Sequence, residues 1–151
     1  RRLLRARALA GLQRLRDHPL TDKARIVAIG YCFGGTAVLE LARGGAELSG
    51  VVSFHGTLDT PGPPGAGAIK AKVLVLTGAD DPSVPPAQVA AFQEEMRTAK
   101  ADWQVISYGG AVHSFTNPES GDDPSKGAAY HAVADKRSWE HMLVFLAELF
   151  A

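Results

Sequence analysis

The chain carries three side chains, Cys32, Asp81 and His113, whose chemical types and order could perform nucleophilic catalysis. A thiol attacks as its thiolate, so it needs a base that takes its proton, and that base needs a third group that orients it. Histidine and a carboxylate fill these two roles in catalytic triads. The sequence therefore predicts a Cys-His-Asp triad in which Cys32 attacks a carbonyl group.

The residues around Cys32 form a G-x-C-x-G pattern, Gly30-Tyr31-Cys32-Phe33-Gly34, which is typical of a nucleophile elbow. A strand that turns directly into a helix forces its middle residue into a strained backbone conformation, and flanking glycines remove the Cβ clashes that would forbid the turn. The free N–H groups and the positive end of the helix dipole at such a turn favour a thiolate. We therefore expect Cys32 to be exposed and reactive.

Short apolar runs alternate with amphipathic runs along the chain and define the elements that must hold these residues. A proline at 86 suits the start of a helix, and paired glycines at 44 and 45 suit the end of one. We expect strands at 25–30, 50–54, 72–77 and 103–108, and helices at 1–16, from the turn at Cys32 to about 43–45, at 86–98 and at 132–150.

The alternation of strands and helices predicts the α/β fold class, with a mainly parallel sheet between two layers of helices. The carboxyl ends of parallel strands meet at one edge of a sheet, where ligands bind. Cys32, His55, Asp81 and His113 all follow predicted strands. We therefore expect these four side chains to converge at that edge.

The two terminal helices have apolar spacing that predicts which side each one buries. The Arg-rich start could also be read as a transit peptide, but the spacing favours a surface helix that faces the sheet. The residues expected on its buried side are Leu3, Leu4, Ala8, Leu12 and Leu15. Those expected in the stripe of the last helix are Trp139, Met142, Leu143, Leu146 and Leu149 or Phe150.

Composition limits the class of protein. The 151 residues, 46% of them hydrophobic, are enough for one domain, 1–151, with a core. Sixteen basic and sixteen acidic residues cancel, which argues against nucleic-acid and membrane-surface partners. A single cysteine excludes an intrachain disulfide, and no apolar run reaches the about 18 residues that span a bilayer. We expect a cytoplasmic protein.

Taken together, the motifs resemble the dienelactone hydrolase family, which are α/β-hydrolases with a Cys-His-Asp triad. The matching pieces are GYCFGG around Cys32, GADDPSVP around Asp81, HSF at His113 and the closing YHAVADKRSWEHMLVFL, so the resemblance covers nearly the whole chain. It implies that Cys32 is the nucleophile, His113 the base and Asp81, rather than Asp80, the acid. It also implies that the N–H of Phe33 contributes to the oxyanion hole.

The resemblance implies a hydrolase that cleaves a small-molecule ester or lactone through a thioester, without a cofactor or a metal. The residues it suggests for substrate binding are Tyr31, His55, Phe115 and Asn117. His55 could equally be structural. Asn117 stands where dienelactone hydrolases themselves carry an arginine for the substrate carboxylate, so the resemblance implies the reaction class rather than one substrate.

Members of the family begin with several strands before the nucleophile strand, and those strands carry a second oxyanion donor. The chain therefore resembles the C-terminal portion of the fold, and the strand at 25–30 would have a neighbour only on the side of 50–54. We therefore expect the chain to form a homodimer or to need a preceding segment. Two other interpretations remain: a non-catalytic half-domain that binds a partner through this sheet edge, and a redox-sensing thiol, although no second cysteine is present.

Overall fold

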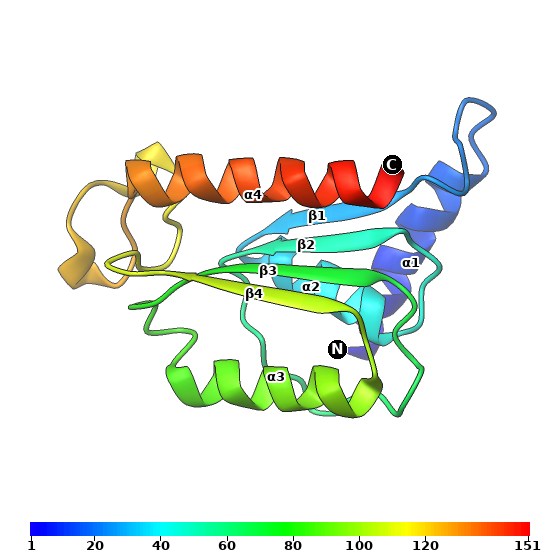
Figure 1. Cartoon of the computed structure of the whole chain (residues 1–151), viewed down its shortest axis with the longest axis horizontal. Helices are drawn as coiled ribbons and strands as arrows, with labels where there is room; N and C mark the ends of the chain where they lie inside the picture. Colours follow the sequence, from blue (N-terminus) through cyan, green and yellow to red (C-terminus); the bar gives the residue numbers. More distant parts are fainter.

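The computed structural model describes residues 1–151 and contains a four-stranded parallel sheet with the strand order β1-β2-β3-β4 (Figure 1). The predicted fold class is confirmed. The elements in chain order are α1 (Arg2–Arg16), β1 (Val27–Tyr31), α2 (Phe33–Arg43), β2 (Gly50–Phe54), β3 (Lys72–Gly78), α3 (Pro86–Ala99), β4 (Trp103–Tyr108), two short 3-10 turns (Pro118–Ser120 and Pro124–Lys126) and α4 (Ala132–Phe150).

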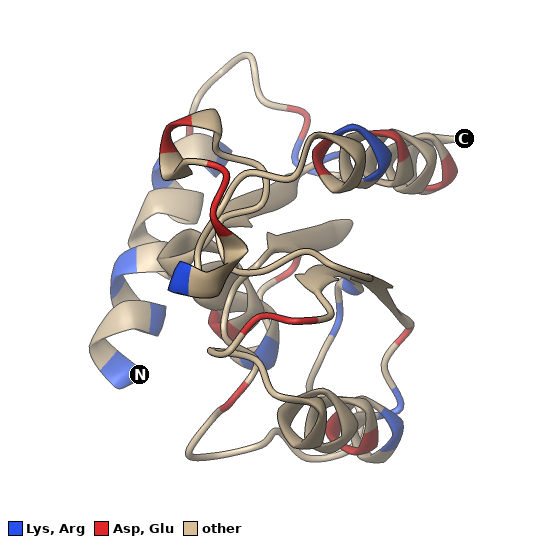
Figure 2. Ribbon diagram, turned by 90° about the vertical axis from the view of Figure 1, so that its left-hand side faces the viewer, with Lys and Arg blue, Asp and Glu red and all other residues tan.

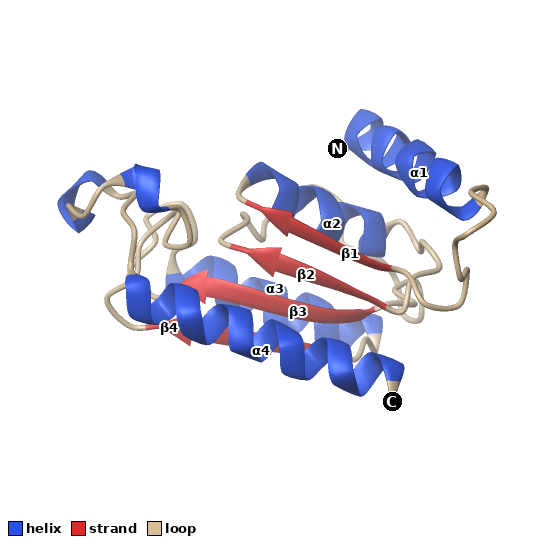
Figure 3. Cartoon of the chain, turned by 90° about the horizontal axis from the view of Figure 1, so that it is seen from above, coloured by secondary structure: helices blue, strands red, loops and turns tan.

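Helices cover both faces of the sheet, and alternate residues of the central strands supply the two cores. Val51 and Val73 lie on the face covered by α2 and α3, whereas Val52 and Leu74 face α4, and all four are buried. Figures 1 and 3 show α4 alone on its face of the sheet. Burial on both faces explains why β2 and β3 read as continuous apolar runs. No helix is long and apolar enough to cross a membrane.

The strand and helix positions follow the predictions closely. The predicted bounds of β2, β4 and α4 are those observed, and α2 ends at Arg43 as expected. β1 begins and ends later than predicted, at Val27 and Tyr31, and lies at the edge of the sheet with β2 as its one neighbour. The strand that leads into Cys32 is thus unpaired on one side.

The prediction that α1 faces the sheet is wrong. Leu12 is its one buried residue, while Leu3 and Leu15 are 64% and 48% exposed. α1 packs on α2 instead, where Arg5 Nε lies 2.7 Å from Glu40 Oε2. Because α2 already covers the sheet beside β1, α1 becomes an outer element (Figure 3).

The predicted apolar stripe of α4 is partly wrong. Met142 and Phe145 are buried against the sheet, and Leu146 and Leu149 pack against the same core. Trp139 and Leu143, however, are about half exposed. The helix lies over β2 and β3, so the residues on its flank are left open.

A buried ion cluster ties the helix that follows Cys32 to its surroundings. Arg43 of α2 binds Glu95 of α3 at 2.7 Å, Glu40 of its own helix at 3.0 Å and the Leu58 carbonyl at 2.6 Å. The side chains of Arg43 and Glu40 are 1% and 0% exposed. Arg43 is the one buried residue among the lysines and arginines, several of which belong to α1 (Figure 2). The cluster fixes α2, and with it the elbow, against α3.

Candidate active site

The turn around Cys32 has the strained geometry expected of a nucleophile elbow. Cys32 has φ 52° and ψ −121° and is the residue that caps the N-terminus of α2. A Cβ on Gly30 would overlap the carbonyl of Gly34, so the turn requires glycine there. Cys32 is exposed at the carboxyl end of β1.

Three of the predicted site residues lie in hydrogen-bonding contact. Cys32 Sγ is 3.1 Å from His113 Nε2, and His113 Nδ1 is 2.9 Å from Asp81 Oδ2. Asp81 is buried, and its other oxygen accepts the N–H of Ser83 at 2.8 Å. Asp80 is exposed and accepts the N–H of Gly110 instead. Asp81, and not Asp80, therefore orients the imidazole.

The environment of His113 favours its protonated form. The hydrogen bond to Asp81 raises the pKa of His113 to about 9, against the opposing effect of burial, and the contact with Cys32 acts in the same direction as Asp81. At neutral pH the imidazolium of His113 therefore faces the sulfur of Cys32. An imidazolium at 3.1 Å stabilises a thiolate.

The loop that carries His113 is held by backbone hydrogen bonds. His113 donates its N–H to the Gly127 carbonyl at 3.2 Å and accepts the Ala129 N–H at 3.1 Å. The next residue, Ser114, has φ 57°. A Cβ on Gly78 would overlap the carbonyl of Ala111, so the end of β3 and this loop approach closely. These contacts hold the ring of His113 beside Cys32.

His55 lies behind the triad rather than on its rim, since it is 3% exposed. Its Nδ1 accepts the N–H of Cys32 at 3.2 Å, and its Nε2 lies 2.9 Å from Thr116 Oγ1. Sequence reasoning placed His55 at the correct strand end but did not find either contact. It missed Thr116 altogether. The one sequence signal for a role of Thr116 was its position three residues after His113.

The remaining predicted substrate contacts are placed as follows. Tyr31 is 42% exposed and stacks on Phe54, with ring centroids 4.4 Å apart. Phe115 is fully buried, edge-on to His55, so the prediction that it contacts substrate is not supported. Asn117 accepts the N–H of Glu119 and caps the following turn. Ser114, between His113 and Phe115, has φ 57°, so the backbone turns there, and Phe115 enters the core while His113 faces Cys32.

Phe33 is the first residue of α2, and its side chain is exposed. The first N–H groups of an α-helix have no partner within the helix, so the N–H of Phe33 is available to an anion beside Cys32. Thr36 makes the first bond of the helix, to the Cys32 carbonyl at 3.2 Å. This arrangement suits a donor to an oxyanion on a carbon bonded to Cys32.

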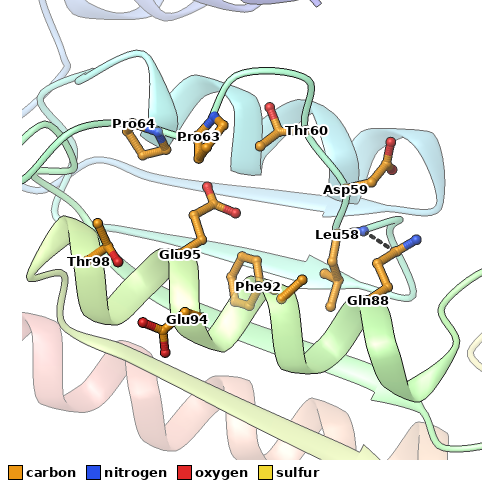
Figure 4. Close-up of a pocket in the computed structure, with 11 residues that line it drawn as sticks. Leu58, Asp59, Thr60, Pro63, Pro64, Gln88, Phe92, Glu94, Glu95 and Thr98 are labelled. Atoms are coloured by element: carbon orange, nitrogen blue, oxygen red, sulfur yellow. Dashed lines mark hydrogen bonds between the residues drawn. The ribbon is translucent and has the colours of Figure 1, made fainter.

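A hollow of about 510 Å³ lies elsewhere, between α3 and the loop that follows β2 (Figure 4). Its walls include Leu58, Pro63 and Phe92, and Gln88 at one end accepts the Leu58 N–H at 2.8 Å. None of the triad residues lines it. Cys32, Asp81 and His113 therefore lie apart from this hollow.

Comparison with known proteins gives consistent matches. The model of the dienelactone hydrolase family matches residues 2–150. An uncharacterized protein of Caenorhabditis elegans is 42% identical over 151 residues, covering 98% of this chain and 95% of the relative. A crystal structure of a dienelactone hydrolase-like promiscuous phosphotriesterase from metagenomic libraries is 46% identical with a TM-score of 0.87.

The chain is shorter than several of its relatives. The match to the phosphotriesterase covers 97% of this chain but 61% of the phosphotriesterase chain. A Salmonella typhimurium protein, named provisionally as a carboxymethylenebutenolidase, is 27% identical over 84% of this chain and 47% of its own length. The sheet, the elbow and the extent of the family match lead to one conclusion. The chain belongs to the dienelactone hydrolase family.

Proposed function

We propose that this chain carries the catalytic triad of an ester or lactone hydrolase, with Cys32 as nucleophile, His113 as base and acid, and Asp81 as the group that orients His113. The observation that carries the proposal is the continuous contact from Cys32 Sγ through the His113 ring to buried Asp81, with distances of 3.1 and 2.9 Å. Family membership supports the reaction class. Residues 1–151 act as one domain in this proposal.

The reaction begins with the thiolate of Cys32 and the imidazolium of His113. The sulfur bonds to the substrate carbonyl carbon, and the carbonyl π electrons move to its oxygen, which accepts the N–H of Phe33. When the oxyanion collapses, the C–O bond to the leaving group breaks and His113 Nε2 gives that oxygen its proton. The product of this half-reaction is a thioester on Cys32 and a free alcohol or enol.

Water completes the cycle. Neutral His113 takes a proton from a water molecule as its oxygen bonds to the thioester carbon. The second tetrahedral intermediate then expels the Cys32 thiolate, releases the carboxylic acid and restores the starting pair. Asp81 stays ionised throughout and stabilises the imidazolium.

An acyl-transfer assay tests this proposal. Incubation with p-nitrophenyl acetate should release p-nitrophenol and add an acetyl group to Cys32, visible in the intact mass. Ethyl acetate should react far more slowly, because a thiolate leaves the tetrahedral intermediate more readily than an alkoxide does, and Cys32→Ser should move the ratio toward the alkyl ester. Equal rates on the two esters, or acetylation elsewhere, would contradict the thioester route.

A second candidate role, binding a partner through the edge of β1, is favoured by the edge itself. β1 leaves one side of its backbone unpaired, and Ile29 and Tyr31 are 43% and 42% exposed. Such an edge pairs readily with another strand. Sedimentation tests whether the chain forms a dimer. A stable monomer with full hydrolase activity would count against both a dimer and a requirement for a preceding segment.

A further inference from the structure

His55 is a buried side chain that the proposed reaction does not use. It follows β2 directly, has φ 40° and is 3% exposed. Its ring lies edge-on to that of His113, with centroids 5.2 Å apart, and edge-on to that of Phe115 at 5.3 Å. His55 therefore lies between the elbow that carries the nucleophile and the loop that carries the base.

Both ring nitrogens of His55 have partners, one on each side. Nδ1 accepts the N–H of Cys32 at 3.2 Å, a donor that also reaches the Phe54 carbonyl at 3.0 Å. A nitrogen that accepts a hydrogen bond carries no proton, so the proton of the neutral ring is on Nε2. Nε2–H then donates to Thr116 Oγ1 at 2.9 Å. The contacts thus specify one tautomer.

The surroundings of His55 keep it neutral. Burial lowers the pKa of His55 to about 4, and the nearby charge of His113 acts in the same direction, against the weaker opposing effect of Asp81. A proton on Nδ1 would point at the N–H of Cys32, so protonation would also break the contact with the elbow. His113 therefore carries the charge of the site while His55 supplies fixed hydrogen bonds.

We propose that His55 is a positioning residue that joins the nucleophile elbow to the loop of the base through the Cys32 N–H and Thr116 Oγ1. This inference rests on the proposed function. Cys32 and Ser114 both have positive φ, 52° and 57°, so each side of the site contains a strained residue beside a reacting group. Such conformations persist only when their surroundings fix them. One rigid ring bonded to both sides fixes the distance from Cys32 Sγ to His113 Nε2.

Three substitutions separate the two contacts. The Oδ1 of Asn is attached to Cγ as Nδ1 of His is, so His55→Asn retains an acceptor for Cys32 and loses Thr116. The Nε2 of Gln is attached to Cδ, one bond farther from the backbone than Nδ1 of His. His55→Gln therefore retains a donor to Thr116 and loses the acceptor for Cys32. Thr116→Val removes the hydroxyl and keeps the side-chain shape. The matched control is Thr57→Val, which removes a hydroxyl contact of 3.0 Å to Thr36 nearby.

The experiment measures the rate of Cys32 alkylation by iodoacetamide from pH 6 to 10, and kcat and KM for p-nitrophenyl acetate. We expect Thr116→Val and both His55 variants to lower the alkylation rate at pH 6.5 and kcat by about 10-fold, with KM little changed, because the second layer of contacts around a site typically contributes this much. Rates at pH 10 should agree within about 2-fold, since a thiol ionises there without help. Thr57→Val should behave as wild type.

The outcomes distinguish the two proposals. If wild-type Cys32 reacts rapidly at pH 6.5 and Thr116→Val and His55→Asn react equally rapidly, the positioning role is overturned and the hydrolase proposal stands. If wild-type Cys32 follows the profile of a free thiol and no acetyl group is transferred, both are overturned. Circular dichroism shows whether each variant is folded, and Thr116→Val, at a half-buried position, provides the answer if a His55 variant does not fold.

Discussion

Replacing Asp81 with Asn should remove most of the reactivity of Cys32 near neutral pH, because the carboxylate of Asp81 keeps His113 protonated. Their hydrogen bond of 2.9 Å is the main reason that the pKa of His113 rises from 6.5 to about 9. That difference corresponds to about 3 kcal/mol, at about 1.4 kcal/mol per tenfold change. The side chains of Asp81 and His113 are 0% and 19% exposed, so solvent screens their interaction little.

The assay is the rate of iodoacetamide alkylation as a function of pH, and it is unambiguous because the chain has a single cysteine. The raised pKa keeps His113 charged up to about pH 9, so the wild type should react at pH 6.5, well below the pKa of about 8.5 of a free thiol. In Asp81→Asn, the rate at pH 6.5 should fall by up to about 100-fold and converge with the wild type near pH 10.

Asp80→Asn is the matched control for this experiment. Asp80 is the preceding carboxylate, exposed and bonded to the N–H of Gly110 rather than to His113. Its loss should change the rate by no more than about 2-fold, as for other exposed charges. The reasoning is refuted if Asp81→Asn reacts at pH 6.5 as fast as the wild type, or if Asp80→Asn has the larger effect.

Three further results are expected. Gly30→Ala should lower the free energy of unfolding by about 3 kcal/mol in urea titrations, because its Cβ overlaps the Gly34 carbonyl; a neutral effect would contradict the elbow geometry. Arg43→Ala should cost about 3 kcal/mol by the same measurement, since it removes the buried partner that Glu40 and Glu95 share and leaves Glu40 bonded to Arg5 alone; a loss below about 1 kcal/mol would show that the cluster relaxes. His55 has a folded-state pKa lowered from 6.5 to about 4, so its contribution to stability is present above pH 6.5 and lost as the pH falls to 4. The difference in unfolding free energy between wild type and His55→Asn should therefore shrink by up to about 3 kcal/mol between pH 7 and 4. A difference that stays constant would refute the lowered pKa of His55.

The proximity of Cys32, Asp81 and His113 could be predicted because each of them follows a strand that the sequence indicates clearly. The apolar runs that became β1, β3 and β4 end just before Cys32, Asp81 and His113. Parallel strands bring their carboxyl ends to one edge, so three separate local patterns were enough to bring distant residues together. The choice of Asp81 over Asp80 as the acid came from the family resemblance and stays a prediction; in the structure Asp81 is buried and contacts His113.

The orientation of the outer helices could not be predicted in the same way. Apolar spacing shows that a helix has a buried side, but the side depends on what the helix packs against. α1 packs on α2 rather than on the sheet, which leaves Leu3 and Leu15 exposed. In α4, Phe145 is buried while Trp139 is half exposed, because the helix lies over the inner strands and not over the edge strand.

The role of His55 was hidden because it depends on the register between two strands. Tyr31 of β1 lies opposite Phe54 of β2, so the residues that follow them, Cys32 and His55, become neighbours across the end of the sheet. The N–H of Cys32 reaches the Phe54 carbonyl of that strand at 3.0 Å, and His55 Nδ1 adds a second acceptor at 3.2 Å. The residue that follows β2 is therefore the place where a side chain can contact the turn at Cys32, and this could be inferred only once the register of β1 and β2 was known.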